Sequence, residues 1–114
     1  ICAIEINHVL ADRLGDKYKY VRVYRADFLD WSPDQPFDRI VMNPPFRNAE
    51  DIKHIQHARK MLKPDGRLVA ICANGPRQRK QLQPIAREWI DLPEGSFKDQ
   101  GTNVNAAIVV LEAE

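Results

Sequence analysis

Short apolar runs alternate along the chain with segments in which apolar residues recur at helical spacing. Runs that are apolar, β-branched or aromatic predict strands at residues 1–6, 20–26, 38–42, 67–73, 88–92 and 106–111. Helices are predicted at residues 7–14, 49–62 and 77–87. Pro84 is expected to kink or shorten the last of these helices, because proline lacks the backbone donor that a helix interior needs.

Capping and turn residues mark the ends of these elements. Asn7 is expected to cap the first helix, and Gly15 is expected to end it. Either Asn48 or Asp51 is expected to cap the second helix, and the turn at residues 63–66 to end it.

The order of the elements indicates the fold class. Strands that alternate with helices indicate parallel pairing through crossover helices. The last two predicted strands are joined by a loop rich in Gly, Asn and Ser, so they are expected to form an antiparallel hairpin. The expected fold is therefore α/β, with a mostly parallel sheet, flanking helices and a C-terminal antiparallel hairpin. A chain of 114 residues fits one domain spanning 1–114.

Composition indicates the general class of protein but does not indicate its binding partner. A hydrophobic content of 44% and a charged content of 29% are typical of a soluble globular protein. The net charge of +1 means that a nucleic-acid role cannot rest on bulk charge. Both cysteines lie in apolar strands and are expected to be reduced core residues, and the histidines lack metal-site spacing. A cytoplasmic location is expected, because no signal peptide or membrane-spanning segment is seen.

The sequence Asn43-Pro44-Pro45-Phe46 follows a predicted strand and precedes a predicted helix. It is therefore expected in a loop at the carboxyl edge of a parallel sheet, where open α/β folds bind ligands. The two prolines stiffen the loop, so that the Asn43 side-chain oxygen and the Pro44 carbonyl oxygen can accept from one amine. Phe46 can then stack on the ring that bears this amine.

The motif and its flanks resemble a known family. Residues 37–46 resemble the catalytic segment of class I S-adenosylmethionine-dependent amino-methyltransferases, which methylate exocyclic or amide nitrogens, most often adenine N6 in DNA. Residues 62–71 are similar to the helix-to-strand turn that follows in many members. Residues 92–97 and 101–105 further resemble phage- and plasmid-borne members. The resemblance implies a Rossmann-like fold, S-adenosylmethionine as cofactor and nucleic acid as partner, with DNA favoured over RNA.

The resemblance also implies roles for particular residues. Glu5 matches the acid that binds the cofactor's ribose hydroxyls, and Asp27 matches the acid that accepts from its adenine amine. Phe28 or Leu29 would pack on the adenine ring. Asn43 belongs to both sets, as the catalytic residue that binds the target nitrogen and as part of the cofactor site.

Each of these residues also has an ordinary structural explanation. Glu5 could cap the following helix or pair with a basic neighbour, and Asp27 could cap a turn. Phe46 could belong to the core. Arg77, Arg79 and Lys80 could meet phosphates near the site or simply form a solvated helix start.

The family's first strand and glycine-rich cofactor loop are expected upstream of Ile1, so the domain is expected to be truncated. Methylation of RNA or of a protein glutamine amide remains an alternative, as does a non-catalytic remnant or binding domain. A nicotinamide-dependent oxidoreductase is disfavoured, because no residues suited to hydride transfer accompany Glu5. Phe97 is a further candidate for the lining of the target pocket.

Overall fold

The computed structural model describes residues 2–5, 7–95 and 105–114, so the candidate Phe97 lies outside it. The chain divides into two compact units, Ile1–Asp34 and Gln35–Glu114. A single domain across the whole chain therefore stays a prediction, and each unit is described by itself.

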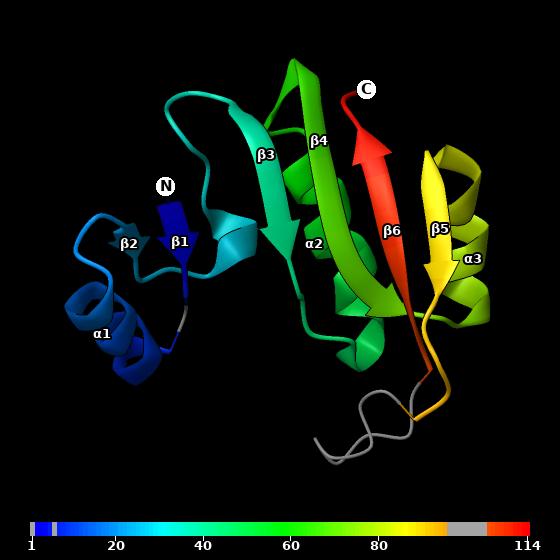
Figure 1. The fold of residues 1–114 in the computed structure, drawn as a ribbon, viewed down its shortest axis with the longest axis horizontal. Coiled ribbons are helices and arrows are strands. Elements are labelled where there is room, and N and C mark those ends of the chain that lie inside the picture. Colours follow the sequence, from blue (N-terminus) through cyan, green and yellow to red (C-terminus); the bar gives the residue numbers. More distant parts are fainter. Residues whose placement is uncertain (1, 6, 96–104) are drawn as a thin grey trace. The chain divides into compact units, whose positions relative to one another are not determined.

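The first unit is built on two short parallel strands joined by a helix. Strand β1 (Cys2–Ile4) pairs with β2 (Arg22–Tyr24), and α1 (His8–Lys17) connects them (Figure 1). A single 3₁₀ turn, η1 (Phe28–Asp30), follows β2. The predicted strand–helix–strand order is confirmed here.

Helix α1 starts where the sequence predicts and ends later. The Asn7 side chain accepts from the backbone N–H groups of Val9 and Leu10, at 3.0 and 3.2 Å. The expectation that Gly15 ends the helix is wrong, because α1 runs on to Lys17. A glycine inside a helix costs only about 1 kcal/mol relative to alanine, which continued hydrogen bonding can offset.

The second unit contains a four-stranded sheet in the order β3-β4-β6-β5. Its strands are β3 (Phe37–Met42), β4 (Leu62–Ala73), β5 (Glu88–Asp91) and β6 (Ala106–Glu112). Strands β3 and β4 are parallel, whereas β6 is antiparallel to both β4 and β5. The predicted α/β fold with a C-terminal antiparallel hairpin is confirmed.

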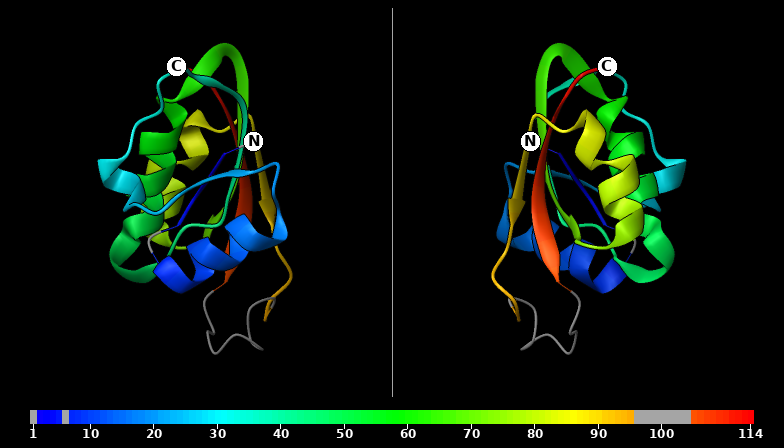
Figure 2. Two further views of the ribbon diagram at one scale, coloured as in Figure 1. Left: turned by 90° about the vertical axis from the view of Figure 1, so that its left-hand side faces the viewer. Right: turned by 90° about the vertical axis from the view of Figure 1, so that its right-hand side faces the viewer.

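The helices of this unit are α2 (Glu50–Arg59) and α3 (Pro76–Gln81), with 3₁₀ turns η2 (Arg47–Ala49) and η3 (Gln83–Ile85). Both α2 and α3 lie on the same face of the sheet (Figure 2). As predicted, Pro84 falls where the last helix gives way to a 3₁₀ turn.

The core of this unit lies between α2 and the central strands. Ile55 of α2 and Leu68 of β4 are fully buried, as are Val109 and Leu111 of β6. The opposite face of the sheet is much more open, and Val41 is 83% exposed there. The alternation of buried and open positions along β4 is typical of a strand with one packed face.

The expectation that a turn at residues 63–66 ends the second helix is wrong, because α2 ends at Arg59 and these residues form an irregularity within β4. Leu62 pairs with Phe37, and regular pairing resumes only where Arg67 meets Arg39. A Cβ on Gly66 would lie 2.9 Å from the Lys63 carbonyl oxygen, so only glycine fits this bend without a shift of the backbone.

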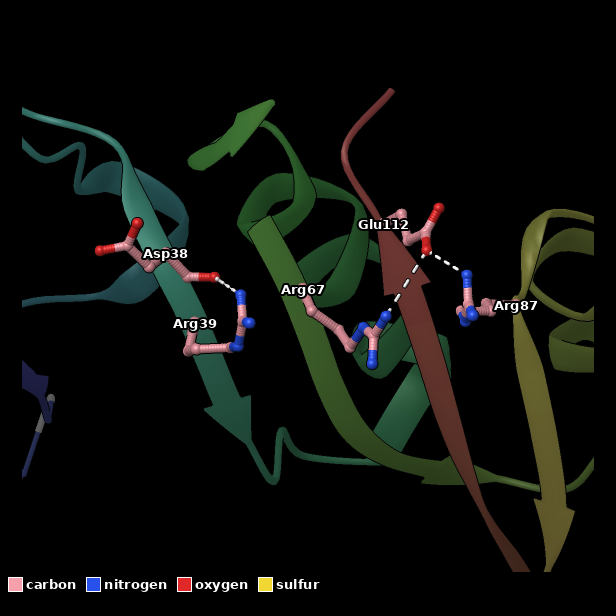
Figure 3. A network of polar contacts seen from close by, with 5 residues as sticks. All are labelled: Asp38, Arg39, Arg67, Arg87 and Glu112. Atoms are coloured by element: carbon pink, nitrogen blue, oxygen red, sulfur yellow. Dashed lines mark hydrogen bonds and ion pairs between the residues drawn. The ribbon is translucent and has the colours of Figure 1, made fainter. Parts of the chain in front are cut away.

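Ion pairs link three strands at the edge opposite the carboxyl ends of β3 and β4. The Glu112 carboxylate pairs with Arg87 and, at 3.7 Å, with Arg67 (Figure 3). The figure also shows Arg39 donating to the carbonyl of Asp38. All three side chains of the Glu112 group are about half exposed, so these pairs contribute little to stability.

Candidate functional site

The loop that contains Asn43 follows the carboxyl end of β3, as predicted. Asn43 and Pro45 are exposed, Pro44 is buried and Phe46 is half-buried. No described residue forms a hydrogen bond with the Asn43 side chain, so its amide oxygen is available to a ligand. Pro44 thus anchors a loop whose amide remains accessible.

Two residues of η2, which follows this loop, have left-handed backbone conformations. Asn48 has φ 55° and Ala49 has φ 59°, and neither is glycine. This conformation costs an ordinary residue about 1–2 kcal/mol, and such strain is often found near functional sites. The expectation that Asn48 or Asp51 caps α2 is wrong, because the cap position is Ala49, without a side-chain hydrogen bond.

The strain at Ala49 can be tested by stability measurements. We expect Ala49→Gly to raise the free energy of unfolding by up to about 1 kcal/mol, because glycine adopts positive φ without a Cβ clash. Ala58→Gly is the control, since residue 58 lies inside right-handed α2 and should lose at least about 1 kcal/mol. Urea unfolding followed by circular dichroism measures both, and equal losses in the two variants would contradict the strain.

Asp51 is fully buried and organises the start of α2 from within the protein. Its carboxylate accepts from the backbone N–H of Ala73 at 2.8 Å and from that of Ile52 at 3.0 Å. The side-chain amide of Gln78 donates to its two oxygens at 3.1 and 3.2 Å. Gly75 leaves room for this contact, because a Cβ there would lie 2.9 Å from Gln78 Oε1.

This network joins the carboxyl end of β4, the start of α3 and the first turn of α2. Only the short turn η2 separates α2 from the Asn43 loop, so Asp51 holds the helix start close to the end of that loop. The sequence offered one signal for Asp51 that was missed. Its position lies four and seven residues before Ile55 and Ala58, on the buried stripe of α2.

The cysteines agree with the expected structural role. Both are free, with Cys72 buried and Cys2 half-buried. Burial, reinforced by the nearby Asp51 charge, raises the pKa of the Cys72 thiol to about 12. Cys72 therefore stays a neutral thiol at physiological pH and is unsuited to act as a nucleophile.

Among the basic residues after β4, Arg79 is anchored by a series of hydrogen bonds. Arg79 Nε donates to the side-chain oxygen of Asn74 at 2.8 Å, and the Asn74 amide nitrogen donates to Asp91 at 2.8 Å. The Trp89 indole N–H donates to the same Asp91 oxygen at 3.1 Å. This group lies at the carboxyl ends of β4 and β5.

In the first unit, Glu5 and Asp27 lie at one edge of the two-stranded sheet. The Glu5 N–H donates to the carbonyl of Tyr24 at 3.0 Å, and the Ala26 N–H donates to that of Glu5 at 3.2 Å. Both acids therefore lie beyond the carboxyl ends of neighbouring parallel strands.

Asp27 also has the ordinary structural role that was considered for it. One of its oxygens accepts from the Leu29 N–H at 3.0 Å, and this bond caps η1. A carboxylate has further lone pairs, so the second oxygen retains acceptor capacity. Phe28 next to it is half-buried, and Leu29 is 37% exposed.

Other features of the described residues do not contribute to this site. A hollow of about 390 Å³ on the first unit is lined by Ala11, Asp12, Gly15, Asp16, Val23 and Arg25, none of them predicted site residues. Groups of three or more side chains able to hold a metal ion are absent from the described parts of the chain. In those same parts, no helix has the length and apolar character needed to cross a membrane.

Each of the two units carries polar side chains beyond the carboxyl ends of its parallel strands, where open α/β folds bind ligands. Residues 3–89 match the methyltransferase small domain, so the chain belongs to that family. The prediction of a methyltransferase is thus confirmed at the level of the family, and membership of this family supports S-adenosylmethionine as the cofactor. No curated protein matches the chain by sequence.

Solved structures share the fold. The chain superposes with TM-score 0.70 and 17% identity on the N-methyltransferase NodS of Bradyrhizobium japonicum, solved with S-adenosyl-L-homocysteine, covering 98% of this chain and 65% of NodS. The 23S rRNA methyltransferase ErmE superposes with a TM-score of 0.68 at 22% identity, and the match covers 99% of this chain and 52% of ErmE.

TrmN from Thermus thermophilus also gives a TM-score of 0.68 at 22% identity, covering 99% of this chain and 36% of TrmN. At these identities the likeness shows the fold alone, which confirms the Rossmann-like prediction. The chain spans only about a third to two thirds of the length of these three proteins.

Proposed function

We propose that the chain transfers a methyl group from S-adenosylmethionine to an exocyclic amine, with adenine N6 in DNA as the substrate. The observation that supports this most is the accessible amide of Asn43, anchored by buried Pro44 at the carboxyl end of β3. The left-handed turn that follows at Asn48 and Ala49 is further support, because local strain is common at functional sites.

The acceptor half of the reaction is assigned to the second unit. The Asn43 side-chain oxygen and the Pro44 carbonyl oxygen each accept one N–H of the target amine. These bonds hold the nitrogen as it pyramidalises and its lone pair leaves conjugation with the ring. Phe46 stacks on the base and keeps the ring in place. Positioning of this kind supplies much of the rate enhancement in a direct transfer.

The cofactor half is assigned to the first unit. Glu5 accepts from the ribose hydroxyls, the second Asp27 oxygen accepts from the adenine amine, and Phe28 packs on the adenine ring. These donor and acceptor types fit an adenosine group. When bound, S-adenosylmethionine supplies a methyl group activated by a sulfonium. The amine proton can leave to solvent after transfer, so no strong general base is required.

The nature of the polymer is the part of this proposal that needs the widest test. The loop is proposed to bind the amine and not the polymer that carries it. Methylation of RNA or of a glutamine amide would therefore require the same loop chemistry. RNA is the second candidate, because ErmE and TrmN share the fold and ErmE acts on 23S rRNA by name. Adenine in DNA is preferred because of the resemblance around residues 37–46.

The test is incorporation of labelled methyl groups from S-adenosylmethionine into DNA, RNA and protein, followed by identification of the methylated residue. N6-methyladenine in DNA is the expected product. The same product in RNA would transfer the proposal to the second candidate. Calorimetric titration with S-adenosylmethionine runs in parallel, and absence of both binding and incorporation would identify a non-catalytic domain.

A further inference from the structure

The segment from residue 74 to residue 87 has a strongly one-sided charge. It contains Arg77, Arg79, Lys80 and Arg87 and no acidic side chain. Arg87 pairs with Glu112, at the opposite edge of the sheet. The other three are exposed and form no ion pair with any described residue. Their charge is therefore available to an external anion.

Arg79 differs from an ordinary surface arginine because its guanidinium is held at one end. Asp91 accepts from the Asn74 amide nitrogen, which directs the amide oxygen of Asn74 toward Arg79 Nε. The Trp89 indole N–H fixes the same carboxylate oxygen. Each contact orients the next, so the Arg79 side chain has lost much of its rotational freedom before any ligand arrives.

The anchored guanidinium keeps its outer donors. Arginine has five N–H groups; Nε is used by Asn74 Oδ1, and Nη2 lies 3.5 Å from the Asn74 carbonyl oxygen. The remaining N–H groups form a fork that suits two oxygens of a phosphate. Arg77 and Lys80 add further positive charge on the same short helix.

This group lies at the same edge of the sheet as the Asn43 loop. Strands β3 and β4 are parallel, so both of their carboxyl ends point to that edge (Figure 1). The Asn43 loop follows one strand and Asn74 follows the other. The two features are further joined within this unit through Asp51, which contacts both α2 and Gln78 of α3.

We propose that Arg79, oriented by Asn74 and Asp91, binds backbone phosphates of the nucleic acid whose base enters the Asn43 loop, with Arg77 and Lys80 contributing charge. This inference rests on the proposed function. In it, α3 binds the phosphate backbone, which is the same for every base sequence. Phosphate contacts of this kind set affinity and register, whereas the base itself is held by the loop.

The test is equilibrium binding of a fluorescently labelled 20-nucleotide DNA, measured by anisotropy without cofactor at several salt concentrations. Arg79→Gln is expected to weaken binding about tenfold and to lower the salt slope by about one unit. Arg39→Gln removes the same charge from β3, outside the proposed site, and its affinity is expected to stay within about twofold of the wild type. Thermal unfolding confirms that each variant is folded.

Two variants separate orientation from charge. Arg79→Lys keeps the charge but lacks the fork, and Asn74→Ala keeps Arg79 but removes its anchor; each is expected to lose about three- to fivefold in affinity. The double variant Asn74→Ala/Arg79→Gln is expected to bind no more weakly than Arg79→Gln. Additive losses would overturn the role of Asn74 as the residue that orients Arg79.

Equal affinities for Arg79→Gln and Arg39→Gln, or no binding by the wild type at low salt, would overturn the phosphate site. Because binding is measured without cofactor, a loss of the phosphate contact can be told apart from a loss of methyl transfer. Normal oligonucleotide binding with no incorporation would refute the proposed catalysis and leave the phosphate contact in place.

Discussion

Replacing Asn43 by alanine is expected to lower kcat for methyl transfer by about 10² to 10³, with a much smaller change in the KM for S-adenosylmethionine. An oriented acceptor that acts on the reacting group contributes on this scale. The side chain is exposed and forms no hydrogen bond with the described residues, so its loss should leave stability almost unchanged. The measurement is initial rate against substrate concentration, with radiolabelled cofactor.

The matched control is Gln56→Ala, which removes an exposed amide from α2. It should retain full activity. Asn43→Asp keeps an acceptor at the same position and is expected to retain more activity than the alanine variant. Full activity in Asn43→Ala would end the assignment of the amine-binding role to this residue.

Replacing Asp51 by alanine is expected to lower the free energy of unfolding by about 3 kcal/mol, which is a large share of the stability of a small domain. The substitution leaves the Ala73 N–H and the Gln78 amide buried without their acceptor, and each such group costs about 1–3 kcal/mol. Urea unfolding followed by tryptophan fluorescence measures this loss.

Glu50→Ala is the control for Asp51, because it removes an acid from the same first turn of α2, where Glu50 is only half-buried. Its effect should stay below about 1 kcal/mol. Asp51→Asn keeps the shape and one acceptor oxygen, and it should fall between the two. A loss at Asp51 no greater than at Glu50 would show that the buried network contributes little.

Much of the fold follows from patterns that are local in the sequence. The apolar runs that become β4 and β6 pack one face against α2, and their β-branched composition predicted strands. Pro84 ended the third helix for a steric reason that needs no tertiary context. Gly15 did not end the first, because a glycine is only a weak signal when the helix can keep its hydrogen bonds.

The site was predictable only where the motif is contiguous. The loop from Asn43 to Phe46 lies where strand-then-helix order placed it, because motif and flanks adjoin in the chain. The hydrogen bonds that link Arg79, Asn74 and Asp91 were not predicted. Asn74 and Asp91 are 17 positions apart in the sequence and meet only once the sheet has formed. Asp51 was expected at a helix start, but its partners come from β4 and α3.

One consequence arises from the position of Gln78 between two arginines. Its amide grips Asp51, whereas its neighbours in the sequence project into solvent. Through this contact a single residue of α3 holds the carboxylate that lies in the first turn of α2. A substitution of Gln78 would therefore remove the hydrogen bonds that join the helix proposed to bind phosphate to the helix that comes after the Asn43 loop.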